Sequence, residues 1–236
     1  MSKRVAGPPQ DETAPSGGSA AHGVASVGAD AFMPQGTVYG VLLNFRRELD
    51  ALAPQMNQAP YKSAPKAPVL YVKTANTWST HGAAIAVPAR VPEVEIGATI
   101  AMVMGDAGQL QGYVLMNDLS IPHASFFRPP VKFKCLDGFL GIGGRLLPVD
   151  QAGDPAAFTL EVHINGELKQ SVDFSQLVRP AVQLLADVGE FMTLQPGDVL
   201  MLGCDTGRPF AQVGDRINIT APGFGTLSNT LVAEAG

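Results

Sequence analysis

Short apolar segments separated by glycine and proline turns run through most of this chain, and they constrain its fold more than any other feature. Such segments, rich in β-branched residues and bounded by turn residues, are typical of strands. We predict strands at residues 38–43, 69–72, 85–87, 95–104, 112–115, 158–164, 199–202 and 216–220. Asn165 and Gly166, placed between alternating residues, predict a type I′ hairpin turn, because both residues tolerate positive φ.

Helices are few in the predicted architecture. Residues 46–53 are compatible with a short helix, and residues 175–191 place apolar side chains at helical spacing. The chain has no internal repeat and no regular strand–helix alternation, so a doubly wound α/β fold is excluded. The pattern therefore predicts a β-rich α+β fold.

The first 34 residues differ in composition from the rest. They are rich in proline, glycine, serine and alanine and show no periodicity, which predicts a disordered tail at 1–34 and a single folded domain at 35–236. The tail lacks the continuous apolar stretch of a secretory signal. No later run reaches the roughly 18 apolar residues that a membrane span needs.

Charge and cysteine content narrow the functional classes. The net charge is −5 and no Lys/Arg stripe is present, which argues against nucleic acid as a partner. Cys135 and Cys204 lie far apart without metal-knuckle spacing, so we expect two reduced thiols in a cytoplasmic protein.

Several motifs, taken in order, resemble the fumarylacetoacetate hydrolase family over about residues 36–234. Within that family the resemblance is greatest to the branch that isomerises and decarboxylates intermediates of 4-hydroxyphenylacetate degradation, and to the first of its two halves. It implies a mixed β-sandwich or roll with few helices. The motifs are residues 41–45, 66–73, 100–105, 112–118, 134–139 and 195–200.

The resemblance also implies a chemistry. Members of this branch use Mg²⁺ or Mn²⁺ to chelate a 2-oxo acid and stabilise an enolate, which serves both decarboxylation and isomerisation. The implied substrates are small 2-oxo or 2-hydroxy dicarboxylic acids: 2-hydroxyhepta-2,4-diene-1,7-dioate and 5-carboxymethyl-2-oxo-hex-3-ene-1,7-dioate. The implied protein partner is a homologous second subunit or a second copy of the chain, and no membrane is involved.

The expected metal ligands are incomplete. Asp118 matches the third acidic ligand of the family. The two others form a Glu-x-Glu pair on one face of a strand, and counting back from Gly105 places that pair at Gly97 and Thr99, which are not carboxylates. Only a register shift would bring Glu93 and Glu95 into those positions.

The remaining site residues are also assigned by the resemblance. Lys134 and Asp137 match a Lys-x-x-Asp motif with a catalytic role, although a structural ion pair between them is the alternative. Lys73 and Arg128 are expected to bind substrate, Arg128 through a bidentate contact with a carboxylate. Two departures stand out: Glu48 occupies the place of a histidine base, and Cys204 that of a substrate-binding threonine.

Three hypotheses follow. The chain is a subunit of the metal-dependent isomerase/decarboxylase, or a metal-less pseudo-enzyme that pairs with a catalytic paralogue, or a hydrolase of acylpyruvate-type carbon–carbon bonds. The third requires an activated water, and the missing histidine weakens it.

Overall fold

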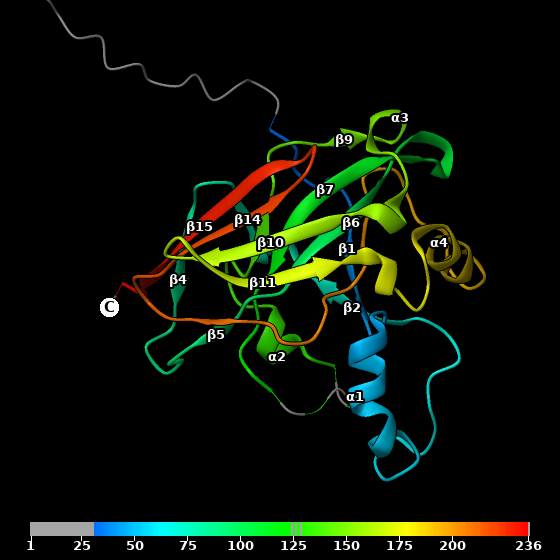
Figure 1. Ribbon diagram of the computed structural model, residues 1–236, viewed down its shortest axis with the longest axis horizontal. Coiled ribbons are helices and arrows are strands. Elements are labelled where there is room, and N and C mark those ends of the chain that lie inside the picture. Colours follow the sequence, from blue (N-terminus) through cyan, green and yellow to red (C-terminus); the bar gives the residue numbers. More distant parts are fainter. Residues whose placement is uncertain (1–30, 124, 126, 128, 236) are drawn as a thin grey trace, which may run out of the picture.

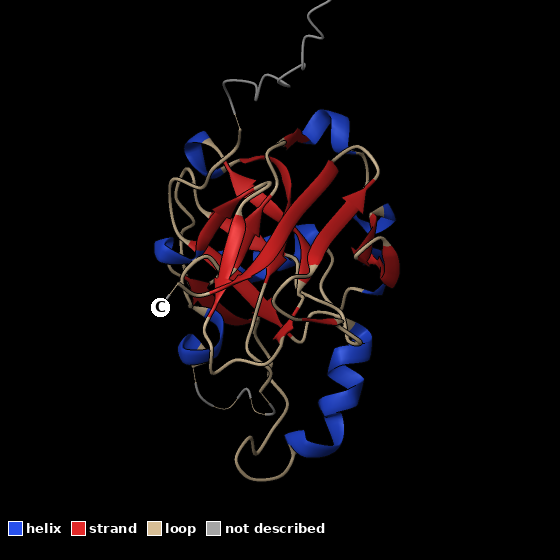
Figure 2. Cartoon of the chain, turned by 90° about the vertical axis from the view of Figure 1, so that its left-hand side faces the viewer, coloured by secondary structure: helices blue, strands red, loops and turns tan. Residues whose placement is uncertain are grey.

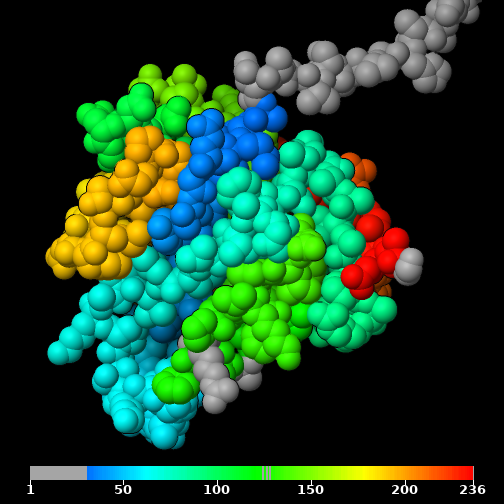
Figure 3. Space-filling model, turned by 180° about the vertical axis from the view of Figure 1, so that it is seen from behind, coloured from blue at the N-terminus to red at the C-terminus, as the bar shows by residue number. Residues whose placement is uncertain are grey.

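The computed structural model describes residues 31–123, 125, 127 and 129–235 (Figure 1). Phe32 donates its backbone N–H to the carbonyl oxygen of Gly144, at 3.0 Å, and Gly36 donates to Gly197, also at 3.0 Å. The chain therefore already packs on the domain a few residues before position 35. Figure 3 shows this blue segment lying against the orange segment that contains Gly197. The rest of the predicted tail, residues 1–30, lies outside the described residues.

A large mixed sheet forms one layer of the molecule. Its hydrogen-bonded order is β2-β1-β12-β6-β7-β8-β3, with β9 paired to β7, and the β1–β12 and β3–β8 pairs are parallel. The strands are β1 (Val38–Leu42), β2 (Val69–Lys73), β3 (Trp78–Thr80), β6 (Ala98–Met104), β7 (Leu110–Asp118), β8 (Leu140–Ile142), β9 (Leu147–Pro148) and β12 (Val199–Met201).

A five-stranded sheet of order β11-β10-β14-β15-β4 forms the second layer, and a two-stranded ribbon, β13-β5, lies apart. In Figure 1, β10, β11, β14 and β15 lie in front of β6, β7 and β1. The strands are β4 (Ala84–Val87), β5 (Val94–Glu95), β10 (Thr159–Ile164), β11 (Glu167–Asp173), β13 (Phe210–Ala211), β14 (Arg216–Ala221) and β15 (Gly225–Ala233). Asn165 and Gly166 have φ of 53° and 85°, so the predicted hairpin turn between β10 and β11 is confirmed.

Helices are short and lie at the edges of the strands (Figure 2). The α-helices are α1 (Arg46–Met56), α2 (Val131–Lys134), α3 (Val149–Ala152) and α4 (Ala181–Gly189). Single 3-10 turns are η1 (Ala75–Thr77), η2 (Asp106–Gly108), η3 (Pro155–Ala157) and η4 (Phe174–Gln176). The prediction of β-rich α+β architecture with few helices is confirmed.

The helix predicted at 175–191 is shorter than expected. It is divided into η4 and α4, and α4 begins only after Pro180, whose φ and ψ of −54° and 159° are not helical. Proline disfavours helical backbone in the residue before it, which explains why the apolar spacing across 175–179 does not continue as helix.

β6 is buried along its whole length, and its alternate side chains enter two different cores. Ile100 and Met102 pack in the core between the two sheets, whereas Ala101 and Val103 pack in a second core on the other face of the large sheet. Burial of both faces explains why β6 reads as a continuous apolar run rather than an alternating one. The second core also contains Leu52 and Met56, which attach α1 to that face.

Candidate functional site

The predicted metal-ligand positions come together at one end of β6 and β7. Side chains two apart on a strand share a face, so Gly97 and Thr99 continue the face of Ala101. The backbone N–H of Asp118 donates to the carbonyl oxygen of Gly97 at 2.8 Å, which places Asp118 opposite Gly97 on the neighbouring strand. The count from Gly105 falls on these positions, and their correspondence to the family's ligand pair stays a prediction.

Asp118 is surrounded by three buried side chains, which together with it we call the Asp118 cluster: Tyr71, Lys73, Asp118 and Lys134. Lys134 Nζ donates to Asp118 Oδ2 at 2.7 Å, and Lys73 Nζ lies 2.9 Å from Oδ1. The Tyr71 hydroxyl donates to Oδ2 as well, and Lys134 Nζ lies 4.7 Å from the centroid of the Tyr71 ring. Oδ2 thus accepts two hydrogen bonds, whereas Oδ1 is in ion-pair contact with Lys73 but accepts no hydrogen bond. The two lysine side chains are at most 2% exposed.

The pKa shifts in this cluster follow from burial and charge. Burial by itself would raise the pKa of Asp118, but Lys134 and Lys73 outweigh burial and hold that pKa well below its ordinary value. Burial lowers the pKa of Lys73; the Asp118 carboxylate opposes this shift and Lys134 adds to it. Burial and the Asp118 charge raise the pKa of Tyr71, so its hydroxyl stays protonated and donates.

Lys73 is held by more than Asp118. Its ammonium group donates to the backbone carbonyl oxygens of Phe139 at 2.7 Å, Leu119 at 3.2 Å and Lys134. An ammonium group has three N–H donors, and these acceptors surround it completely. The expected role of Lys73 in substrate binding stays a prediction, and in this conformation its charged end does not face solvent.

Lys134 and Asp137 point in different directions. Lys134 turns inward to Asp118, whereas Asp137 is exposed and accepts a hydrogen bond from Asn76 Nδ2 at 2.6 Å. The alternative of a Lys134–Asp137 ion pair is therefore not what the structure shows. Arg128 lies outside the described residues.

The residues present do not fit a divalent metal ion. A Cβ atom added at Gly97 would lie 2.4 Å from the carbonyl oxygen of Asp118 and 3.1 Å from Cys204 Sγ, so no side chain fits there without a backbone shift. Thr99 Oγ1 donates to the carbonyl oxygen of Gly203 at 2.5 Å. Within the described ranges, no group of three or more His, Cys, Asp or Glu side chains could hold a metal.

Glu93 and Glu95 are not shifted into the ligand positions. Glu95 exchanges two backbone hydrogen bonds with Ser120, two residues beyond Asp118, and Glu93 is exposed on the preceding turn. The carboxylate of Glu95 lies 3.7 Å from Arg208 Nη1. In the observed register Gly97, not Glu95, is opposite Asp118.

A second polar group lies beside the Asp118 cluster and joins α1 to the loop after β12. Arg208 donates to the Glu48 carboxylate and to the carbonyl oxygens of Asp205, at 3.1 Å, and Cys204, at 3.3 Å. Glu48 also accepts the backbone N–H of Leu43 at 2.7 Å. Burial raises the pKa of Glu48, and Arg208 opposes that shift.

Tyr71 and Arg208 are the two residues of this region that sequence reasoning missed. Tyr71 reads as an ordinary aromatic residue of a strand, and Arg208 sits in a glycine- and proline-containing loop with no motif around it. The only signal in the sequence was proximity to positions already singled out. Arg208 follows the departure at Cys204, and Tyr71 precedes the predicted site residue Lys73. Burial raises the pKa of the Cys204 thiol to about 12, so Cys204 is a neutral group at this site.

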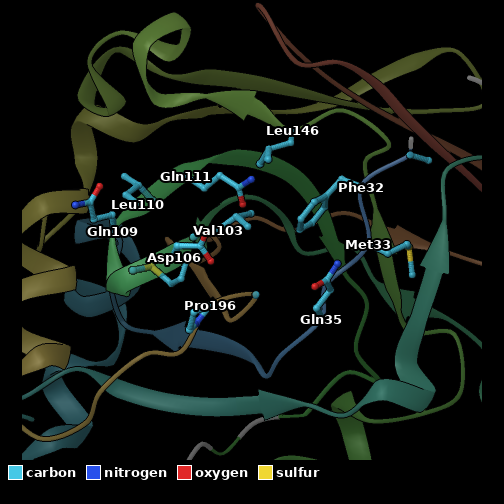
Figure 4. A pocket seen from close by; sticks show the side chains of 14 residues that line it. Phe32, Met33, Gln35, Val103, Asp106, Gln109, Leu110, Gln111, Leu146 and Pro196 are labelled. Carbon is cyan, nitrogen blue, oxygen red and sulfur yellow. The ribbon is translucent and has the colours of Figure 1, made fainter. Parts of the chain in front are cut away.

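Two cavities are relevant to the position of this site, one beside it and one remote from it. One, of about 250 Å³, opens beside Arg208 and is lined by Glu48, Ala51, Leu52, Glu95, Thr206, Gly207 and Arg208. A larger one, of about 630 Å³, lies at the opposite ends of β6 and β7, with Phe32 and Gln35 on one side and Asp106 and Gln109 on the other (Figure 4). Because β6 spans roughly 20 Å, this larger cavity is remote from Asp118.

The comparisons with known proteins agree with this fold. The model of the fumarylacetoacetate (FAA) hydrolase C-terminal domain matches residues 37–232. The chain belongs to the fumarylacetoacetate hydrolase family.

The most similar relatives include bifunctional enzymes. The 4-hydroxyphenylacetate degradation bifunctional isomerase/decarboxylase of Salmonella dublin is 38% identical over 210 residues, covering 85% of this chain and 48% of that protein. The homoprotocatechuate catabolism bifunctional isomerase/decarboxylase of Escherichia coli is 39% identical over 212 residues, with the same coverage. The chain therefore spans about half the length of these curated relatives.

Solved structures show the same fold. The 5-carboxymethyl-2-hydroxymuconate delta-isomerase of Mycobacterium smegmatis superposes with a TM-score of 0.70 at 26% identity, covering 85% of this chain and 80% of that one. The fumarylpyruvate hydrolase of Pseudomonas aeruginosa, solved in complex with Mn²⁺ and pyruvate, superposes with a TM-score of 0.72 at 22% identity, covering 88% and 94%. Among the described residues, no helix is long and apolar enough to cross a membrane.

Proposed function

We propose that this chain is one subunit of an isomerase/decarboxylase that acts on 2-hydroxyhepta-2,4-diene-1,7-dioate and 5-carboxymethyl-2-oxo-hex-3-ene-1,7-dioate in 4-hydroxyphenylacetate catabolism. The catalytic centre of this assembly is contributed by a homologous chain that retains all three acidic ligands. The identity of 38–39% to bifunctional isomerase/decarboxylases supports the pathway, and the half-length match supports a second, homologous unit.

The contacts of Asp118 are the observation that supports placing the catalytic centre on the homologous chain. Its Oδ2 accepts hydrogen bonds from Lys134 and Tyr71, and its Oδ1 lies 2.9 Å from Lys73 Nζ. Its expected partner positions are Gly97 and Thr99. Both reactions need an electrophilic group at the 2-oxo position of the substrate to take up electrons. In this chain two ammonium groups contact the carboxylate that would otherwise be available to such a group.

Hydrolysis of a carbon–carbon bond fits the geometry less well. It requires a base that activates water, and position 48, where the family resemblance implies a histidine, holds a glutamate. Both oxygens of Glu48 are engaged, one by Arg208 and the other by the N–H of Leu43. We therefore do not propose a hydrolase.

The test is reconstitution. We would measure turnover of both dioates by ultraviolet absorbance for the chain alone, for a homologous chain with an intact Glu-x-Glu strand, and for the two co-expressed, each with Mn²⁺. We expect no turnover by the chain alone and higher turnover by the co-purified pair than by the homologue alone.

Two controls make the outcome specific. Glu→Gln substitution of the homologue's strand should abolish activity of the pair, while Asp50→Asn, on an exposed position of α1, should leave it unchanged. Metal-dependent turnover by the chain alone would contradict the proposal, and so would a failure of the two chains to associate.

A further inference from the structure

Three separate segments of the chain converge on Asp118 and bring two positive charges to its one negative charge. Lys73 ends β2, Asp118 ends β7 and Lys134 ends α2. We infer that the ammonium groups of Lys73 and Lys134 are the resident cations of this site. They occupy the place of the divalent metal and brace the three segments in a domain that folds without metal.

The carboxylate geometry is the first support. Lys73 Nζ is 2.9 Å from one oxygen of Asp118 and Lys134 Nζ is 2.7 Å from the other, so a divalent ion at Asp118 would meet two positive charges at contact distance. A hard divalent cation binds oxygen ligands, and a protonated amine offers it no lone pair. Asp118, the carboxylate of this cluster, already has two cations within contact distance.

The second support is the filling of the missing ligand positions. The added Cβ at Gly97 would meet backbone, namely the carbonyl oxygen of Asp118 at 2.4 Å. Such a contact is relieved only by moving the strand. The hydroxyl of Thr99 is turned to Gly203, away from any shared ligand position. The absence of carboxylates at positions 97 and 99 is therefore consistent with the inward-facing side chains of Lys73 and Lys134.

The third support is the backbone that Lys73 organises. Its ammonium group bonds carbonyl oxygens of Leu119, Lys134 and Phe139, which belong to the segment after β7, to α2 and to the approach to β8. A metal held by side chains would leave these carbonyl groups to find other donors. Buried carbonyl groups without a donor are costly, so Lys73 has a structural task that a metal ion does not replace.

The inference does not depend on the substrate or on a partner chain, and its test uses neither. Mn²⁺ binding to the purified full-length chain would be measured by electron paramagnetic resonance, and thermal unfolding would be followed in EDTA and in excess Mn²⁺. We expect no stoichiometric Mn²⁺ and the same melting temperature in both conditions. A bound ion at a hundredfold excess over its Kd would raise the melting temperature by roughly 5–10 °C.

Two variants separate the role of the lysines from general sensitivity. Lys73→Met should lower the melting temperature strongly, while the matched Lys132→Met, on an exposed position of α2, should change it little. Stoichiometric Mn²⁺ bound by the wild type and lost in Asp118→Ala would overturn the inference. Equal melting temperatures for Lys73→Met and the wild type would overturn it too. If Lys73→Met does not fold while Lys132→Met does, the structural role of Lys73 stands, and the wild-type Mn²⁺ measurement decides the rest.

Discussion

At the residue scale, buried charges in this protein are stabilised by specific partners rather than by water. Asp118 has two ammonium groups and a hydroxyl, and Glu48 has a guanidinium and a backbone N–H. Removing one partner of such a group leaves an uncompensated charge, which costs more than the pair itself contributes. Substituting one partner of such a buried pair should therefore lower the free energy of unfolding by more than the pair itself contributes.

Asp118→Asn leaves Lys73 and Lys134 without their counter-ion, and we expect it to cost about 3–5 kcal/mol of unfolding free energy at pH 7. The pKa of Asp118 is lowered on folding, so its contribution is present above the unfolded value of about 3.9 and is lost as pH falls toward the folded value. Urea unfolding at pH 7, 5 and 3.5 should show a constant difference from wild type at the first two and a smaller one at the last. Asp50→Asn, which is exposed, is the control; a difference that does not change with pH would contradict the assignment.

The two cysteines should differ in reactivity. Burial raises the pKa of Cys204 to about 12, so at pH 8 on the order of 1 in 10⁴ of these thiols is ionised. Cys135 is partly exposed and its Sγ lies 3.2 Å from the carbonyl oxygen of Val72. Thiol titration of the native chain at pH 8 should modify Cys135 alone, and both residues after unfolding in urea. Rapid modification of Cys204 in the native chain would show that its surroundings are open.

At the element scale, α1 is attached to the body mainly by its first turn and by a narrow apolar contact. Its buried residues are Glu48, Leu52 and Met56, and Glu48 is held by Arg208, which lies 160 residues away in sequence. Leu43, between β1 and α1, has a φ of 61°, an uncommon conformation for leucine, and its N–H is the one that Glu48 accepts. The Glu48–Arg208 pair thus sets both the entry into α1 and its position.

Arg208→Met should loosen α1. It leaves the Glu48 carboxylate buried without a cation, and we expect a loss of about 3–5 kcal/mol together with faster hydrogen exchange in residues 46–56. Lys169→Met breaks the exposed pair with Glu167 and should cost no more than about 1 kcal/mol. Unchanged exchange in α1 would mean that Leu52 and Met56 are sufficient to hold it.

At the scale of the whole molecule, two sheets share one core, and the large sheet has a second core on its other face. The Asp118 cluster lies at the margin of the second core, which also contains Tyr71. Leu119 and Phe139 of the first core contact the polar site through their carbonyl oxygens, which accept from Lys73. Mutations elsewhere in the first core should therefore test the stability of the fold without altering the site directly.

Leu227→Ala in β15 should cost about 2–5 kcal/mol, because Leu227 is 1% exposed in the core between the sheets and its loss leaves a cavity. Leu168→Ala in β11, where the side chain is 50% exposed, should change the unfolding free energy by no more than about 0.5 kcal/mol. Urea unfolding of the two variants compares them directly. Similar costs would mean that the two sheets do not share a tightly packed core.

Local signals in the sequence were enough for much of the fold and for part of the site. Short β-branched runs and the Asn165–Gly166 turn predicted many of the strands and the hairpin between β10 and β11. These features depend on neighbours a few residues apart, so they can be predicted from one sequence without knowledge of the tertiary structure. Other elements differ from the prediction. Pro180 delays α4, which apolar spacing alone predicted to begin earlier. β3, β8 and β15 were not predicted, and the single strand predicted at 95–104 is divided into β5 and β6.

The partners of the charged residues were decided only by the tertiary structure. Lys134 pairs with Asp118, 16 residues away, rather than with the nearby Asp137, and Glu48 pairs with Arg208 across 160 residues. The choice depends on which groups are sealed from water once the sheets close, because a buried charge requires a partner and an exposed one does not. The sequence by itself predicted that Gly97 and Thr99 stand where the family resemblance implies two acidic ligands. Only the tertiary structure decided that Lys73 and Lys134 contact Asp118.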